Sequence, residues 1–145
     1  MRMKGKKPIF GYRDTFDLDA TLKPIIHAGL VKFKEVITSS DNGFARGVPG
    51  KVLSVHYPDY DGMGELPEGS FEKWVEIIDE MIFAFDESRV PDMSEYNLLY
   101  ECFDDDIDEG NEDRHKKYDS DIREWRIKVL EGRQLFTEYL DCLSW

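Results

Sequence analysis

The sequence has 145 residues, of which 41% are hydrophobic and 13% aromatic, and its formal net charge is −12 at pH 7. This length and composition predict one folded domain spanning residues 1–145 and exclude a disordered chain. The negative charge argues against direct binding to nucleic acid or to an anionic membrane, and it favours basic proteins or cations as partners.

The charge is unevenly distributed along the chain. Residues 1–13, which we call the basic arm, contain five Lys or Arg residues and no acidic residue. Setting these five positive charges aside leaves −17 on the remaining 132 residues. The body of the protein therefore attracts cationic partners more strongly than the total charge indicates.

The cysteine content and the N-terminus indicate the compartment. Two cysteines, Cys102 and Cys142, are too few for a disulfide framework, and the N-terminus lacks the apolar segment of a secretory signal. No run approaches the ~20 apolar residues that span a bilayer. These features predict a soluble protein of the cytoplasm with reduced thiols.

The first predicted element after the basic arm is a helix over residues 18–37. Asp17 or Thr21 is placed to cap it, and Pro24 falls either in its first turn or at a kink. Its apolar residues recur at steps of three and four, as one face of a helix requires: Leu18, Leu22, Ile25, Ile26, Leu30, Phe33 and Ile37.

A short β-hairpin is the next prediction. Residues 51–57, "KVLSVHY", alternate weakly and contain β-branched side chains, which is typical of a strand. Its expected partner is "PIFGY", residues 8–12.

The strongest prediction is a helix within residues 71–88, with Ser70 as its N-cap and Glu72 in its first turn. At 100° per residue, the apolar and acidic side chains separate onto opposite faces. The apolar face consists of Phe71, Trp74, Val75, Ile78, Met81, Ile82 and Phe85. The acidic face consists of Glu72, Glu76, Asp79, Glu80 and Asp86, and Phe83 projects from the middle of it.

The C-terminal third predicts a short helix capped by Ser94, an acidic loop over residues 104–113, and a last helix from about Asp119 or Ser120 to near the C-terminus. Apolar residues of this last helix are spaced by sevens, at Ile122, Val129, Phe136 and Leu143. Gly132 lies on the same face, where another helix can approach closely. The predicted fold is mostly α: a three- to four-helix bundle with a minor short β-hairpin.

Several enzyme classes are excluded by the absence of their motifs. The sequence has no G-x-S-x-G, H-E-x-x-H, C-x-x-C or G-x-x-x-x-G-K-[ST] pattern. The segment from Asp104 to His115 imitates a calcium loop, but Glu109 stands where glycine is needed and His115 where a bidentate glutamate belongs. These acids are therefore expected to attract cations only weakly.

The acidic face of the second helix remains as the main functional lead. It is interpreted either as a solvated surface or, because Phe83 lies among like charges, as a contact for a basic protein, a second buried contact within the bundle or an oligomer interface. The predicted interaction surface is Glu72, Glu76, Asp79, Glu80, Phe83, Asp86, Asp104, Asp105, Asp106 and Asp108. A narrower form of this interpretation is mimicry of nucleic acid, in which the carboxylates take the place of phosphates.

A half-motif gives an enzymatic alternative. "EIIDEMIFAF" resembles one half of the metal-binding pattern of all-α nucleotide pyrophosphohydrolases of the MazG and dimeric dUTPase type. That resemblance implies Mg²⁺ held by Glu76, Asp79 and Glu80, and cleavage of nucleoside triphosphates. The E-x-x-E helix that completes the pattern is missing upstream. No cofactor is otherwise expected.

Four segments taken in order resemble uncharacterised proteins of tailed phages and prophages: "DTFDLDATLKPIIHAGLVKFK", "GVPG", "WVEIIDEMIFAF" and "EGRQLFTEYLDCLSW". The resemblance implies a protein made in the cytoplasm of an infected bacterium and assigns no residue a role. The leading hypothesis is an acidic phage protein that works by binding rather than catalysis, and its expected partner is a host or defence protein that has a basic surface. A virion assembly protein that forms homo-oligomers through its last helix is the third alternative.

Overall fold

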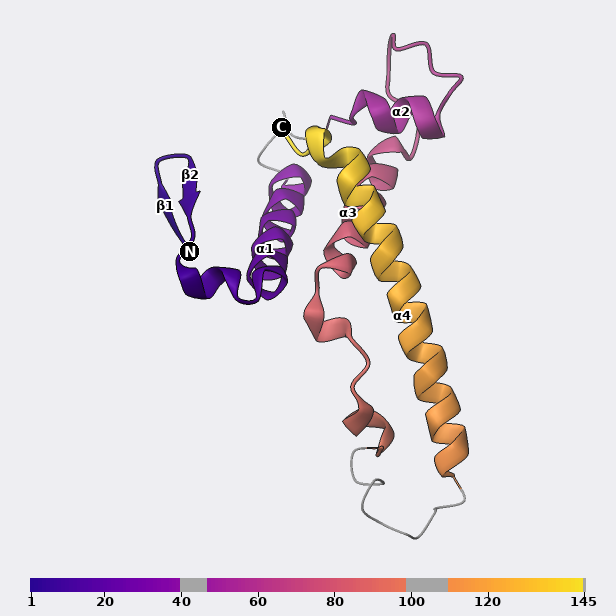
Figure 1. Ribbon diagram of the computed structural model, residues 1–145. Coiled ribbons are helices and arrows are strands. Elements are labelled where there is room, and N and C mark those ends of the chain that lie inside the picture. The colour runs from indigo at the N-terminus through magenta and orange to yellow at the C-terminus, as the bar shows by residue number, and fades with distance from the viewer. Residues whose placement is uncertain (40–46, 99–109, 145) are drawn as a thin grey trace.

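Two antiparallel helices, α3 (Ser70–Ala84) and α4 (Asn111–Tyr139), form the centre of the fold, and α1 (Leu18–Thr38) packs on the other side of α3 (Figure 1). The short helix α2 (Gly50–His56) covers one end of α3. The computed structural model describes residues 1–39, 47–98 and 110–144. Within these ranges the protein is mostly α, as predicted.

The remaining elements are short. The strands β1 (Arg2–Lys4) and β2 (Lys7–Ile9) form an antiparallel hairpin at the N-terminus, in which Met3 pairs with Pro8. Single turns of 3₁₀ helix are η1 (Tyr12–Thr15), η2 (Glu87–Arg89), η3 (Met93–Tyr96) and η5 (Leu140–Cys142). Across the described ranges, no helix combines the length and apolar character needed to cross a bilayer.

The core lies between α1, α3 and α4. Helix α3 supplies the largest share of buried side chains, namely Trp74, Ile77, Ile78, Met81 and Ala84. The Trp74 ring packs against Phe33 of α1 and Tyr139 of α4, with ring centroids 6.4 and 5.8 Å apart. The predicted apolar face of the helix is thus the buried face, because a helix this amphipathic can remove one side from water only by packing it on its neighbours.

Gly132 allows α3 and α4 to approach closely, as the sequence predicted. A Cβ atom at Gly132 would lie 2.6 Å from the Cβ of Ala84 and would overlap the carbonyl oxygen of Glu80. Val129 is buried and Phe136 stacks edge-on against Phe85 at 5.1 Å. The residues of this apolar stripe therefore pack within the chain, and self-association through the last helix stays a prediction.

The prediction of a strand over residues 51–57 is wrong. Residues 50–56 form α2, and the hairpin instead joins β1 and β2 within the basic arm, through a turn in which Gly5 has a φ of +61°. The helical conformation buries Val52 completely while Lys51 donates a hydrogen bond to the carbonyl oxygen of Glu138 at 2.6 Å. Packing on α3 and α4 thus overrides the weak strand propensity of this segment.

The predicted start of α3 differs by one residue. Gly69, with a φ of +77°, is the N-cap, and Ser70 is the first helical residue and is buried. Glycine adopts this left-handed conformation without the Cβ penalty that serine would meet.

The last helix begins earlier than predicted. Helix α4 starts at Asn111, so the end of the predicted acidic loop is helical. Glu112 and Asp113 lie in its first turn, where negative charge is favoured by the helix dipole, and Glu112 pairs with Lys116 at 3.3 Å. With 29 residues, α4 is about 44 Å long.

The predicted short helix near Ser94 is only the 3₁₀ turn η3. Its N-cap is Asp92, whose carboxylate accepts a hydrogen bond from the Ser94 N–H at 3.0 Å. Asn97 follows with a φ of +56°, which ends the turn. The rest of that predicted helix, residues 99–103, lies outside the described ranges.

Candidate functional site

The acidic face predicted for α3 is exposed along the helix. Glu72, Glu76, Asp79 and Glu80 are all exposed, and Phe83 is half-buried. These side chains point away from the core because they occupy the helical positions opposite Trp74 and Met81.

The structure brings four of these residues together in one groove. Glu76, Asp79, Glu80 and Phe83 of α3 face Lys128 and Glu131 of α4, and the six residues line a groove of ≈ 360 Å³. We call this the α3–α4 groove. Its volume is in the range of small ligand sites or of a pocket for one or two partner side chains.

The groove is walled by charges around an apolar patch. The Nζ atom of Lys128 lies 5.8 Å from the centroid of the Phe83 ring, a cation–π contact. Carboxylates from both helices line the same groove. The site therefore already holds a cation against an aromatic ring among acidic side chains.

Two of the acids have basic partners in ion pairs. The Nζ atom of Lys34, from α1, lies 2.7 Å from Asp79 Oδ1, and Lys73 lies 3.6 Å from Glu76. The Lys73–Glu76 pair lies within α3, whereas Lys34 is brought across to α3 by α1. Within the part of the chain that the structure describes, Glu80 and Glu131 form no ion pair.

The groove residues do not fit the Mg²⁺ site of the hydrolase alternative. Among residues 1–39, 47–98 and 110–144, no three His, Cys, Asp or Glu side chains are placed to hold one metal ion. Moreover, Asp79 Oδ1 is already engaged by Lys34. The arrangement of Glu76, Asp79 and Glu80 thus lends no support to metal chemistry, and the hydrolase alternative stays a prediction.

Asp86 is separated from the other predicted residues. It follows the end of α3 and lies in a second hollow of ≈ 370 Å³, with Lys23 and Trp125 among its lining residues. The Ser88 side chain donates a hydrogen bond to Asp86 Oδ1 at 2.6 Å, and this bond, with smaller contributions from the Ser88 N–H and His27, holds the pKa of Asp86 below its ordinary value. Its carboxylate thus stabilises the local turn and is not part of the groove.

The other predicted members of the surface are not in the groove. Glu72 is exposed in the first turn of α3 and does not line it. Asp104, Asp105, Asp106 and Asp108 lie outside the described residues.

Sequence reasoning missed the α4 side of the groove. Lys128 and Glu131 are three residues apart, so they share one polar face of α4. That spacing, together with the close approach predicted at Gly132, is the signal that the sequence contains. It does not identify the groove, because nothing local to α4 specifies that α3 is the neighbour.

No match to this chain was found among protein-family models, curated proteins or solved structures. The resemblances to phage proteins and to MazG-type hydrolases therefore stay predictions. What bears on function is the geometry of the groove.

Proposed function

We propose that this chain is a binding protein whose α3–α4 groove receives a basic segment of another protein. The observation that carries the proposal is the half-buried Phe83 ring lying among carboxylates and already contacted by the ammonium group of Lys128. A lysine or arginine of a partner can contact both the Phe83 ring and the carboxylates around it in the same way.

The chemistry of the groove suits arginine best. A guanidinium group stacks on an aromatic face and also forms paired hydrogen bonds with a carboxylate. Phe83 offers the aromatic face, while Glu80 and Glu131 offer carboxylates that form no ion pair within the described chain. Docking one arginine thus satisfies groups that water alone now solvates.

Long-range charge favours the encounter with such a partner. The residues outside the basic arm carry −17, which attracts a basic surface and raises the association rate at low salt. Together with the resemblance to phage proteins, this supports a host or defence protein of the bacterial cell as the partner.

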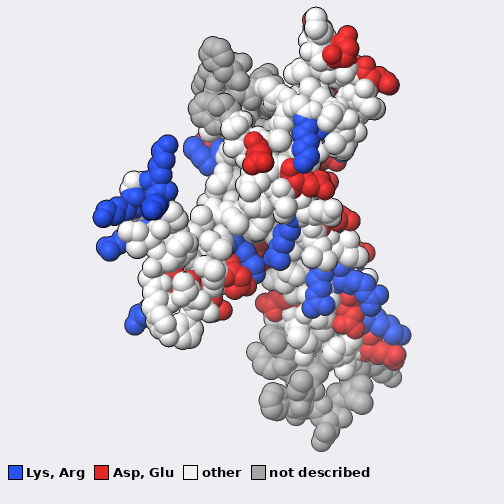
Figure 2. All heavy atoms as spheres, turned by 45° about the horizontal axis from the view of Figure 1, so that its top comes forward, with Lys and Arg blue, Asp and Glu red and all other residues white. Residues whose placement is uncertain are grey.

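Mimicry of nucleic acid receives less support. On the face drawn in Figure 2, acidic and basic side chains are interspersed over the helices and do not form one continuous acidic row. A phosphate backbone presents evenly spaced charges of a single sign. The groove is therefore better matched to one or two basic side chains than to a whole nucleic-acid site.

The proposal is tested by affinity capture from bacterial lysate with three forms of the full chain. The groove variant carries Glu76→Gln, Glu80→Gln and Glu131→Gln, and it leaves the Lys34–Asp79 ion pair intact. The control changes the charge equally at exposed residues elsewhere, with Asp59→Asn, Glu65→Gln and Glu68→Gln.

The expected result is a basic protein recovered by the native chain and the control but not by the groove variant. Its recovery should also fall as salt is raised, because exposed charge pairs are screened. Recovery of the same proteins by all three forms would show that the groove is not the binding site.

A further inference from the structure

The basic arm projects from the body of the protein. Its hairpin stands apart from α3 and α4, with α1 between them (Figure 1), and basic side chains gather on it in the view of Figure 2. Apolar side chains are exposed beside these charges: Tyr12 is 81% and Phe16 74% exposed, and their rings form an edge-on pair at 5.4 Å. An aromatic pair this open to water beside a cationic surface is typical of a protein contact.

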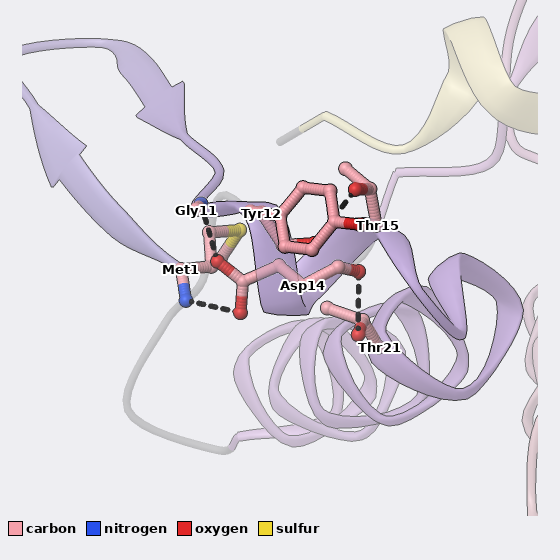
Figure 3. A network of polar contacts seen from close by, with 6 residues as sticks. All are labelled: Met1, Gly11, Tyr12, Asp14, Thr15 and Thr21. Atoms are coloured by element: carbon pink, nitrogen blue, oxygen red, sulfur yellow. Dashed lines mark hydrogen bonds and ion pairs between the residues drawn. The ribbon is translucent and has the colours of Figure 1, made fainter.

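Polar contacts centred on Asp14 hold the arm in place (Figure 3). The Asp14 carboxylate accepts a hydrogen bond from the Gly11 N–H at 2.7 Å and pairs with the N-terminal amine of Met1 at 3.0 Å. The Thr21 hydroxyl of α1 donates to the Asp14 carbonyl oxygen at 3.1 Å. Because the arm is already ordered on α1, docking it elsewhere costs less conformational entropy than ordering a flexible tail.

The arm and the α3–α4 groove complement each other. The arm presents lysines, arginines and the exposed Tyr12 ring, with Phe16 just beyond it, and the groove presents a hollow with an aromatic wall among acidic side chains. We propose that two copies of this chain associate by docking the basic arm of each into the α3–α4 groove of the other. Two such contacts related by a twofold axis close into a dimer.

A second copy fits the arm better than a nucleic acid does. The acidic body repels phosphates, and the exposed Tyr12 and Phe16 rings gain from an apolar surface such as that around Phe83. Pairing of strands between copies is also disfavoured, because Pro8 and the flanking lysines blunt the edge of the hairpin. The contact is therefore made by side chains.

The inference goes beyond the proposed function, since it concerns what fills the groove in the absence of another protein. In the dimer, the arm of the second copy occupies the groove, so a basic partner must displace that arm in order to bind. The two ideas fail separately, because a variant with a disabled arm keeps its groove intact.

The test is sedimentation velocity on the full chain at low and at high salt, with charge reversals on each side. The arm variant carries Lys4→Glu and Lys7→Glu, and the groove variant carries Glu76→Lys and Glu80→Lys. The native chain should be a dimer that weakens with salt, and each reversed variant alone should associate at least roughly tenfold more weakly. Mixing the two variants should restore association, because both contacts of the mixed dimer again bring opposite charges together: the native basic arm meets the native acidic groove, and the reversed arm meets the reversed groove.

The apolar part of the contact has a matched control. Tyr12→Ser should weaken the dimer, whereas Met63→Ser, at another exposed apolar residue, should leave it unchanged. A native chain that is monomeric at low salt would overturn the proposal, as would a dimer indifferent to both charge reversals. Binding of a labelled oligothymidine by a monomeric native chain, lost in the arm variant, would overturn it in favour of nucleic acid.

Discussion

Replacing Gly132 by alanine tests the close approach of α3 and α4 that creates the groove. The new Cβ would lie 2.6 Å from the Ala84 Cβ and 3.1 Å from the backbone carbonyl carbon of Glu80. Apolar carbons pack at about 3.5–4.0 Å, so the two helices must separate by roughly 1 Å. A gap of that size forfeits a quarter to a half of the dispersion energy between the atoms that face each other.

The net effect is the difference between two terms. Overpacking in a close-packed interior costs about 1–3 kcal/mol, and the upper end applies here because the obstacle is backbone, which cannot rotate away. Alanine gains about 1 kcal/mol over glycine in helix propensity. We expect Gly132→Ala to lower the free energy of unfolding by about 2 kcal/mol, which corresponds to a fall in Tm of roughly 6 °C for a chain of this size.

Gly29 provides the matched control, since it is also a helical glycine but a Cβ there would meet nothing within 4 Å. Gly29→Ala should therefore raise the free energy of unfolding by about 0.5–1 kcal/mol. Urea denaturation followed by circular dichroism measures both variants. If Gly132→Ala were as stable as Gly29→Ala, the helices would not be in contact at this glycine, and the groove would lack its second wall.

Three further predictions follow from other parts of the fold. Trp74→Ala should cost about 3–5 kcal/mol in urea denaturation, because it empties a buried aromatic site between three helices; a cost under ~1 kcal/mol would contradict its place in the core. The hydrogen bond from the Tyr96 hydroxyl to Asp121, 2.6 Å long, raises the pKa of Tyr96 to about 12, and ultraviolet titration should show Asp121→Asn returning it toward 10.0. An unchanged pKa in that variant would refute the assignment. Because folding raises the pKa of Tyr96, its contact with Asp121 stabilises the protein fully below pH 10.0, and this stabilisation is lost as the pH rises toward 12. The hydrogen bond from the Gly11 N–H, and to a lesser extent the N-terminal amine, lowers the pKa of Asp14 from 3.8. The stabilisation from these contacts of the Asp14 carboxylate is therefore present above pH 3.8 and is lost as the pH falls through the lowered pKa. Asp14→Asn should speed amide exchange at Gly11 at neutral pH.

Local periodicity was sufficient to predict the main helices and the buried side of α3. Seven apolar residues between Phe71 and Phe85 recur with the helical repeat, and burying that side against other helices is the only way to remove it from water. Gly132 was predicted as a close approach for a similar reason, since a glycine within an apolar stripe leaves room for a neighbour. The acidic side of α3 follows as the complement of the buried side.

The tertiary structure alone decided which neighbour each helix meets, and this determined the site. Lys34 pairs with Asp79 across 45 positions of sequence, and Lys128 reaches the Phe83 ring from a helix that follows much later in the chain. Residues 50–56 became a helix because burying Val52 on α3 outweighs a weak strand preference. Periodicity specifies which face of a segment leaves water, but the ion pairs and the groove depend on the rotation and contact of helices that only packing of the whole chain fixes.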